Sequence, residues 1–207
     1  FLFNEKRKLI ENQILEEAKE QATKQENKKY ILVYGNNWHL GVLGIIASKI
    51  SGIYFRPVIV ISFLNKIGVG SARSINNVDL GKIILNAKQE KIIINGGGHS
   101  MAAGLKINFS NLERFRNYLD NKFSLFDEKL FERTDNYDSI ISVNDINSEL
   151  IHSIEILQPF GKGNPEPTFI VNDIQIHSIK IIKNKHILFF FENDLGQKIK
   201  GICFNSM

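Results

Sequence analysis

The sequence has a single cysteine, Cys203, so an internal disulfide and a zinc site built from cysteines are both excluded. Cys203 stands in an apolar, strand-like pattern, which predicts a small buried side chain. No run approaches the roughly 18 apolar residues that a membrane span requires, and no signal peptide is visible. The net charge of +4 is compatible with an anionic partner but does not demand one.

The chain does not begin with methionine, and its first residues already follow a helical pattern, so we expect it to be a piece of a longer protein. Residues 4–26 are predicted to form one amphipathic helix with Asn4 as its N-cap. Its apolar residues at helical spacing are Leu9, Ile10, Ile14, Ala18 and Ala22. This stripe has to pack on another part of the protein, because an isolated helix of this kind is only marginally stable.

Strands and helices alternate over the next hundred residues, which predicts an α/β domain. The expected strands are 30–34, 58–62, 66–71, 92–95 and 105–109, and the expected helices are 40–50, 79–90 and 110–123. The first strand, helix and strand have the order of a parallel βαβ unit. Gly41 and Gly44 lie on nearly one face of the first of these helices, which predicts close packing against a strand. Ser110 and Glu113 are expected to form a capping box.

The stretch from Asn95 to Gly104, NGGGHSMAAG, is the most distinctive in the chain. Three consecutive glycines predict a turn that lets backbone N–H groups approach a ligand, and such a turn before a helix N-terminus suits a phosphate. His99 stands at its mouth, where it can donate a hydrogen bond or a proton. The alternative is a sharp turn that needs glycine for a positive φ, with a histidine that happens to follow. The small residues Ala102 and Ala103 favour the binding hypothesis.

A second candidate binding motif is the segment GSARS, residues 70–74. Side chains two residues apart in a strand lie on the same face, so Ser71 and Arg73 are expected side by side. A guanidinium offers a two-pronged donor to phosphate, and a hydroxyl adds one more donor. The alternative is an exposed arginine in an ordinary ion pair.

Beyond the α/β domain the pattern changes. Residues 124–136 are charged and lack periodicity, which predicts a linker. After it we expect a strand at 139–143, a helix at 147–157 and strands at 168–171, 174–182, 187–191 and 198–204, with hairpin turns at 184–185 and 193–196. Successive hairpins favour a small β-barrel. Of the three phenylalanines 189–191, at least one has to point into that barrel, because adjacent strand residues alternate faces.

Four segments resemble a known family: the glycine stretch, residues 38–47 (WHLGVLGIIA), residues 70–74 and residues 158–167 (QPFGKGNPEP). The glycine stretch resembles the DHH-associated domain of DHH-type phosphoesterases, and the other three resemble the RecJ single-strand-specific exonucleases. The resemblance spans the chain from about residue 30 to its end. It implies an α/β DHH-associated substrate-binding domain with βαβ units and a mixed sheet, followed by a small OB-fold-like barrel whose completeness the ending at Met207 leaves open.

The resemblance also implies domain limits: a connector helix from a DHH nuclease domain at 1–28, the α/β domain at 29–123, a linker at 124–137 and the OB-fold-like domain at 138–207. It implies nucleic-acid contacts at Ser71, Arg73, Ser74, Gly96, Gly97, Gly98, His99, Lys162 and Asn164, with His99 assisting catalysis at the substrate phosphate. For residues 158–167 a structural junction is the favoured interpretation. Trp38 is expected to pack, and His39 either faces the nuclease domain or is structural.

Metal-dependent hydrolysis needs clustered carboxylates and histidines, and the family builds that cluster in the DHH domain. No Asp-His-His motif occurs here, and no carboxylate lies at ligand spacing beside His99. Manganese or magnesium is therefore expected outside this piece, with none bound here, and the piece alone is expected to be inactive.

The resemblance favours the substrate-binding portion of a cytoplasmic 5′-to-3′ single-stranded-DNA exonuclease of DNA repair and recombination. Its partners would be single-stranded DNA, the DHH domain and other repair proteins, with no membrane. Two alternatives stay open: a DHH phosphoesterase acting on nanoRNA or cyclic dinucleotides, and a non-catalytic single-strand-binding module.

Overall fold

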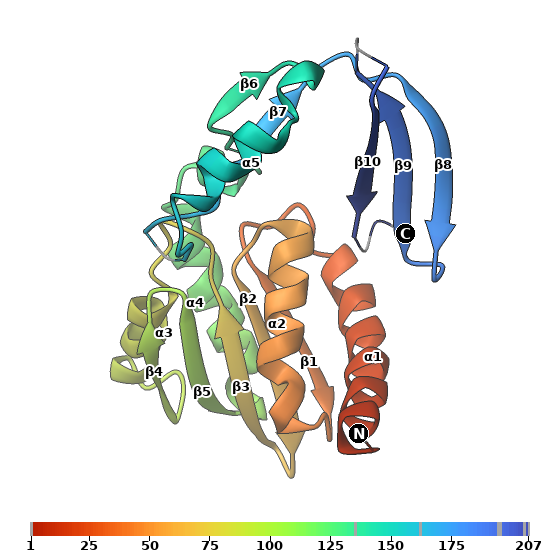
Figure 1. Ribbon diagram of the computed structural model, residues 1–207. Coiled ribbons are helices and arrows are strands. Elements are labelled where there is room, and N and C mark those ends of the chain that lie inside the picture. Colours follow the sequence, from red (N-terminus) through yellow and green to blue (C-terminus); the bar gives the residue numbers. More distant parts are fainter. Residues whose placement is uncertain (1, 135, 162, 194–195, 205, 207) are drawn as a thin grey trace. The chain divides into compact units, whose positions relative to one another are not determined.

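The computed structural model describes residues 2–134, 136–161, 163–193, 196–204 and 206 (Figure 1). The chain divides into two compact units, unit 1 ending at Arg133 and unit 2 beginning at Thr134. This division falls inside the stretch 124–137 that the sequence predicts as a linker. Within the described ranges, no helix is both long and apolar enough to cross a membrane.

Unit 1 is built on a mixed sheet of five strands in the order β1-β2-β3-β5-β4 (Figure 1). The strands are β1 (Ile31–Asn36), β2 (Val58–Leu64), β3 (Ile67–Arg73), β4 (Asn95–His99) and β5 (Ala102–Asn108). β1 and β2 are parallel, and the other neighbouring pairs are antiparallel. Helix α2 (Leu40–Tyr54) joins β1 to β2, which confirms the predicted βαβ unit.

The helices lie in two layers, one on each side of the sheet. Helix α1 (Leu2–Thr23) and α2 cover one face, and α3 (Leu80–Gln89) and α4 (Leu112–Ser124) cover the other, with short 3-10 turns η1 (Phe109–Asn111) and η2 (Glu128–Phe131). Successive strand residues alternate between the two cores: Leu32 and Ile59 pack with α3 and α4, and Val33 and Val60 with α1 and α2.

Two buried phenols secure α4. The Tyr118 hydroxyl donates to the Ile83 carbonyl of α3 at 2.8 Å, and the Tyr30 hydroxyl donates to Asp120 of α4 at 2.8 Å. Burial raises the pKa of Tyr118 to about 12. Burial, with the hydrogen bond to Asp120, also raises the pKa of Tyr30. Both groups therefore remain protonated donors at neutral pH.

Helix α1 and the turn that follows it are attached to the sheet through two glutamines four residues apart. The Gln21 amide bonds both the N–H and the carbonyl of Tyr34, at 3.0 and 2.8 Å. Gln25 does the same for Leu32, at 3.2 and 3.0 Å. Because β1 is an edge strand, its outer backbone groups would otherwise be left to water or to another strand.

Unit 2 contains β6 (Ser139–Ile141), η3 (Val143–Asp145), α5 (Ser148–Glu155), β7 (Phe169–Val171), β8 (Ile176–Ile182), β9 (His186–Glu192) and β10 (Lys198–Cys203). β6 and β7 pair in parallel, and β10, β9 and β8 form an antiparallel sheet. The predicted fold class, an α/β domain with a mixed sheet followed by a small β region, is confirmed. The described strands of the second region form two sheets rather than one closed barrel.

The prediction of a glycine turn leading into a helix is wrong. Gly96, Gly97 and Gly98 belong to strand β4, which pairs with β5 as a hairpin whose turn is Ser100 and Met101. Residues 92–94, expected as a strand, lie in a loop before it. The physical reason is that a glycine chain can be extended as readily as turned, and pairing with β5 decides between the two.

Three smaller predictions are also corrected. Asn4 lies inside α1 rather than at its N-cap, because the helix begins at Leu2. Ser110 is part of the turn η1, so α4 begins later than expected, with Asn111 as an N-cap that makes no side-chain bond. Cys203 is exposed rather than buried, since no described element covers this end of β10.

Candidate functional site

The face of the sheet on the α2 side is covered over β1 and β2 but lies open over β5 and β4. Residues directly opposite each other in an antiparallel ladder point to the same side. The register therefore aligns three rows across β3, β5 and β4, which we call the open face: Arg73–Ala102–His99, Ser71–Gly104–Gly97 and Val69–Lys106–Asn95. All nine residues are at least partly exposed.

Two paired glycines form the centre of the open face. A Cβ added to Gly97 meets nothing within 4 Å, and one added to Gly104 meets only the Gly70 carbonyl, at 3.8 Å. Neither residue has a positive φ. The chain itself therefore has no steric need for glycine here, and the result is a floor without side chains on which another molecule can lie close to the backbone.

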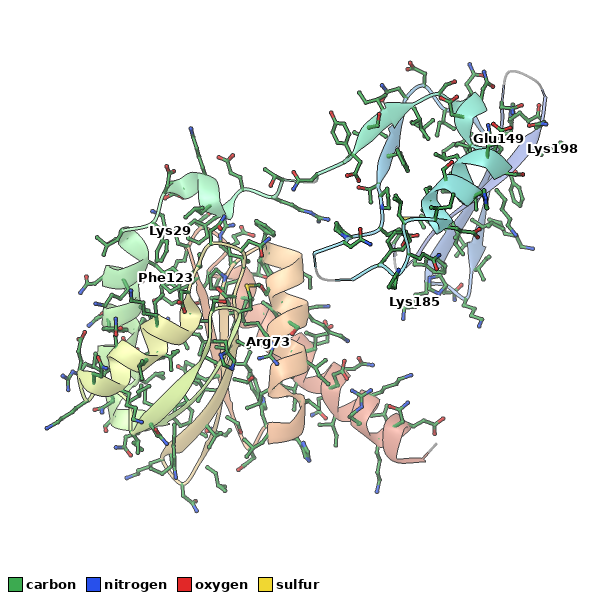
Figure 2. All side chains as sticks on the ribbon, turned by 60° about the vertical axis from the view of Figure 1, so that its left-hand side comes forward. Lys29, Arg73, Phe123, Glu149, Lys185 and Lys198 are labelled. Atoms are coloured by element: carbon green, nitrogen blue, oxygen red, sulfur yellow. The ribbon has the colours of Figure 1, made fainter. Side chains whose placement is uncertain are left out.

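Arg73 ends β3 at the border between this floor and α2 (Figure 2). Its Nη1 donates to the Ala72 carbonyl at 2.8 Å and to the Ser71 hydroxyl at 3.4 Å, which confirms that the two side chains lie together. In the part of the chain that the structure describes, no carboxylate pairs with Arg73. The guanidinium therefore combines partial burial with donors that remain available to an anion.

His99 occupies the same row as Arg73, at the outer end of β4. Two strand spacings of about 4.8 Å separate their backbones by about 10 Å. The His99 side chain is exposed, whereas its backbone carbonyl lies against Gly81 at the start of α3. An extended chain of phosphates crossing the floor can therefore meet Arg73 on one side and His99 on the other.

The other predicted residues of these two motifs face away from the open face. The Ser74 hydroxyl is buried and donates to the Val78 carbonyl at 2.7 Å. Gly96 lies against α3, where an added Cβ would come within 2.7 Å of Ile84. Gly98 has a φ of 159° and leaves no room for a Cβ, which would fall 2.2 Å from the Ala102 carbonyl oxygen. Gly96 and Gly98 therefore shape the hairpin behind the floor, and Ser74 holds the loop that leads to α3.

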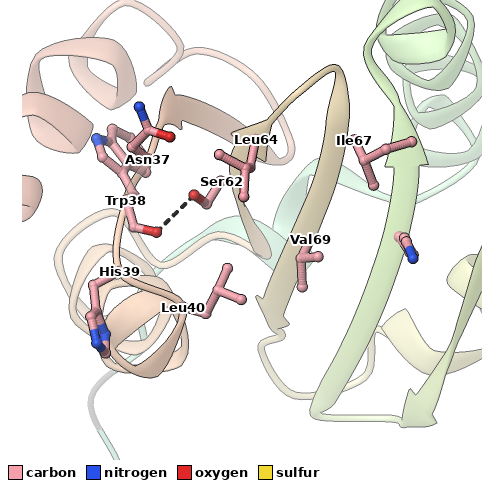
Figure 3. A pocket seen from close by; sticks show the side chains of 9 residues that line it. Asn37, Trp38, His39, Leu40, Ser62, Leu64, Ile67 and Val69 are labelled. Carbon is pink, nitrogen blue, oxygen red and sulfur yellow. Dashed lines mark hydrogen bonds between the residues drawn. The ribbon is translucent and has the colours of Figure 1, made fainter.

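A pocket of about 530 Å³ continues the open face beside α2 (Figure 3). It is lined mainly by apolar side chains, among them Leu40, Leu64, Ile67 and Val69. The Ser62 hydroxyl donates to the Trp38 carbonyl at 2.7 Å and fixes one wall. Sequence reasoning missed this pocket, although the alternation of Ile67, Val69, Ser71 and Arg73 along one face of β3 is a signal that points to it.

Trp38 and His39 are structural elements of that wall. Trp38 is 6% exposed, its indole lies on Gly35, and its Nε1 donates to Glu17 of α1 at 2.8 Å, which confirms the predicted packing role. His39 is the N-cap of α2, because its Nδ1 accepts from the Gly41 N–H at 3.1 Å.

Of the two predicted residues in unit 2, the structure describes only Asn164. Lys162 lies outside the described residues. The Asn164 amide donates to the carbonyls of Leu157 and Pro159 at 2.8 and 3.1 Å, and its backbone pairs with Gly161. Both amide hydrogens are thus used in holding the segment 157–164 together, in line with a structural junction.

The sheet of β8, β9 and β10 has two unlike faces. One carries Phe190 with Lys200 and Ser178 directly opposite it, Leu188 with Lys180 and Ile202, and Glu192 with Lys198; we call it the basic face. The other carries Phe189 and Phe191, whose rings stack at 5.9 Å. Phe191 is buried, and Phe190 is half-buried. The expected alternation of the phenylalanines is confirmed.

The described residues contain no group of three or more His, Cys, Asp or Glu side chains that could hold a metal ion. Among these described residues, neither His99 on the open face nor His39 beside its pocket belongs to such a group. What the open face offers instead is a set of donors and a low floor, which suit an extended anion.

Two family models match the chain, a DHHA1 domain over residues 27–125 and a RecJ OB domain over residues 137–207. The single-stranded-DNA-specific exonuclease RecJ of Bacillus subtilis is 31% identical over 203 residues, which are 94% of this chain and 25% of that protein. RecJ of Haemophilus influenzae is 33% identical over 143 residues, which are 67% of this chain and 25% of that protein. The chain thus spans about a quarter of the length of these two relatives.

The crystal structure of RecJ from Thermus thermophilus in complex with Mn²⁺ has the same fold, with a TM-score of 0.76 at 23% identity over 96% of this chain and 28% of its own. The Mg²⁺ complex gives 0.74 at 22% identity, over 95% of this chain and 30% of its own. The two domain matches and the relatives from Bacillus subtilis and Haemophilus influenzae confirm the family that the sequence motifs indicated. The chain belongs to the RecJ exonuclease family and corresponds to its C-terminal region, a DHHA1 domain followed by the RecJ OB domain.

Proposed function

We propose that this chain is the substrate-binding portion of a single-stranded-DNA exonuclease, in which the open face holds the phosphate backbone of one strand for a nuclease domain outside these residues. The observation that carries the proposal is Arg73, whose guanidinium has no carboxylate partner among the described residues and borders a floor of two paired glycines. An arginine in such a place has its charge and several donors to offer to an anionic ligand, whereas in an ion pair a carboxylate already takes up the charge and part of the donors.

In this proposal each residue of the open face has one task. Arg73 and Ser71 donate to a phosphate, and Gly97 and Gly104 let the sugar–phosphate chain approach the sheet. His99 donates to a second phosphate, and this is the phosphate we assign to the reaction. Lys106 adds a positive charge at the far row.

Unit 2 contributes a second contact in the proposal. The basic face combines Lys180, Lys198 and Lys200 with the half-buried ring of Phe190. Lysines track a phosphate backbone, and an aromatic ring stacks on an unpaired base. Because a duplex keeps its bases stacked within the helix, this face favours single strands.

Family membership extends the proposal to 5′-to-3′ degradation with Mn²⁺ or Mg²⁺, the ions named for the Thermus thermophilus structures. The described residues do not form a site for either ion, so no step of the proposal goes through one. Hydrolysis is assigned to the nuclease domain, for which α1 serves as the connector. We therefore expect the purified chain to leave single-stranded DNA intact with or without manganese, and cleavage that chelation abolishes would contradict this.

The proposal is tested by Arg73→Ala, with affinity for a single-stranded oligonucleotide followed by fluorescence anisotropy. We expect affinity to fall by about tenfold, as for one charge-assisted bond, without a loss of thermal stability. Arg73→Lys should recover only part of the lost affinity, because an ammonium cannot reproduce the planar guanidinium fork. Arg114→Ala, an exposed arginine on α4 across the sheet, is the matched control and should bind normally.

The same titrations repeated at rising salt should show weaker binding, because phosphate contacts release counterions. A duplex of the same sequence should bind more weakly than the single strand. Normal binding by Arg73→Ala, or equal losses in Arg73→Ala and Arg114→Ala, would show that Arg73 is structural.

A further inference from the structure

Gly44 of α2 lies against the two donors of the proposed phosphate site. A Cβ added to Gly44 would come within 2.9 Å of Arg73 Nη2 and 3.2 Å of Ser71 Oγ. Both distances are shorter than ordinary carbon contacts, which begin at about 3.5 Å. The helix therefore runs as close to this arginine as a residue without a side chain permits.

The backbone gives no other reason for a glycine at this place. Gly44 lies inside α2 and is not among the residues with a positive φ. Glycine is less favourable than alanine in a helix interior, so α2 is less stable with Gly44 than it would be with alanine at this position. The atoms nearest to the missing side chain are not backbone atoms, which packing alone would explain, but the ends of two polar side chains.

We infer that Gly44 is a positioning residue that keeps open the space in which the Arg73 guanidinium lies against α2. The inference rests on the proposed role of Arg73 in anion binding. With Nη1 held by the Ala72 carbonyl and the Ser71 hydroxyl, and Nη2 stopped by the helix, the fork is fixed before any ligand arrives. A donor fixed in advance loses less conformational entropy on binding than a free one.

The consequence of filling this space follows from which atoms have to move. A methyl group at position 44 meets the end of a flexible side chain first, so the guanidinium shifts while the helix and sheet stay in place. The shift breaks the bonds of Nη1 or turns the fork away from the open face. Gly44→Ala is therefore expected to stabilise the fold and weaken binding, two changes of opposite direction.

The same helix provides matched controls. A Cβ added to Gly52 meets nothing within 4 Å, and one added to Gly41 meets only the His39 ring, at 3.0 Å. Gly52→Ala should therefore give the gain in helix stability without any effect on Arg73. Gly41→Ala should leave binding unchanged as well, since its only neighbour is the N-cap ring.

The experiment compares Gly44→Ala and Gly52→Ala in the 207-residue chain, by thermal melting and by affinity for a single-stranded oligonucleotide. We expect both variants to melt about 3 °C higher, since alanine is the better helix former. Gly44→Ala should bind about tenfold more weakly, the loss of one charge-assisted contact, and Gly52→Ala should bind normally. In the Arg73→Ala background, Gly44→Ala should cause no further loss.

The outcomes separate this inference from the proposed function. If Arg73→Ala weakens binding but Gly44→Ala binds normally, the positioning role is overturned and the proposed function stands. If Gly44→Ala loses melting temperature and affinity in step, Gly44 is structural and the inference is again overturned. If Arg73→Ala itself binds normally, the proposed function fails first. An additional loss in the double variant would also contradict the inference, because Gly44 would then act on something other than Arg73.

Discussion

The sheet of unit 1 has two halves that differ in how far helices cover their faces. β2 is buried along six of its seven residues because helices cover both of its faces. β3 and β5 alternate between buried and exposed residues, because only α3 and α4 cover them fully. The covered half is built mainly from Ile, Leu and Val, whereas most outward positions of the open half are small or polar, with Val69 as an apolar exception.

This contrast suggests a division of work within one sheet. Fully buried apolar strands contribute most of the hydrophobic stabilisation, about 1.5–3 kcal/mol for each side chain. The open half gains little from its outward face, so those positions are free to be glycine or a cation. The two halves are nevertheless continuous in backbone hydrogen bonds, so the covered half holds the open face rigid.

The largest expected effect concerns Gly97 and Gly98, two adjacent glycines of β4 whose added side chains would point to opposite faces of the sheet. Gly98→Val should lower the free energy of unfolding by about 4 kcal/mol, because its Cβ would fall 2.2 Å from a backbone oxygen. Gly97→Ala should leave stability unchanged or slightly raised, since its Cβ points into open space, but should weaken single-strand binding severalfold.

Urea unfolding followed by tryptophan fluorescence provides the measurement, because Trp38 is the single tryptophan and is buried in unit 1. Normal binding by Gly97→Ala would show that no ligand lies on the glycine floor. A stable Gly98→Val variant would show that the hairpin can shift without cost.

The second effect repeats the comparison within one strand of unit 2. Phe191 is 4% exposed and lies on the apolar face, so Phe191→Ala should destabilise the β8–β10 sheet by about 3 kcal/mol. Phe190 lies half-buried on the basic face. Phe190→Ala should therefore destabilise the sheet less than Phe191→Ala does, and should weaken oligonucleotide binding more. Hydrogen exchange of the β9 amides and oligonucleotide affinity separate the two. If the two variants lost the same amounts of stability and of oligonucleotide affinity, the basic face would be ruled out as a binding surface.

The third effect uses two valines in neighbouring strands. Val60 of β2 is completely buried, and Val69 of β3 is 37% exposed on the open face. Val60→Ala should lower the free energy of unfolding by about 2 kcal/mol, and Val69→Ala by less than about 1 kcal/mol. Trp38 fluorescence in urea again reports unit 1. A loss at Val69 as large as that at Val60 would mean that the open half is as tightly packed as the covered half.

Sequence reasoning succeeded where a local pattern determines the structure. The apolar run after Pro57 and the helix before it predicted the βαβ unit, because both faces of those strands are buried. The two-residue period predicted that Ser71 and Arg73 lie together, and they do. The burial of Trp38 followed from its size.

It failed where partners distant in sequence decide. Glycine fits a turn and an extended strand equally, and only β5 makes Gly96–Gly98 a strand. Cys203 would be buried only if another element covered β10, and no pattern within that strand reveals whether such an element is present. Gly44 was expected to pack against a strand, and it does, but its position against the Arg73 guanidinium depends on how α2 and β3, which are separate in sequence, come together in the fold.

The smallest expected effect on binding belongs to His99, at the outer edge of the open face. Its exposed side chain shares a row with Arg73, so in the proposed arrangement it meets a phosphate without holding the strand. His99→Ala should therefore change oligonucleotide affinity by less than about twofold, since one solvent-exposed hydrogen bond is worth little against water.

The same variant should reduce hydrolysis about a hundredfold in the full-length protein that includes the nuclease domain, because a donor placed at the reacting phosphate acts mainly in the transition state. His99→Gln, which keeps a donor of similar reach, should recover part of the rate. Lys88→Ala, on α3 away from the open face, is the control. A His99→Ala protein that loses affinity and hydrolysis equally would place His99 among the groups that hold the strand, and the contrast between Arg73 and His99 within one row would disappear.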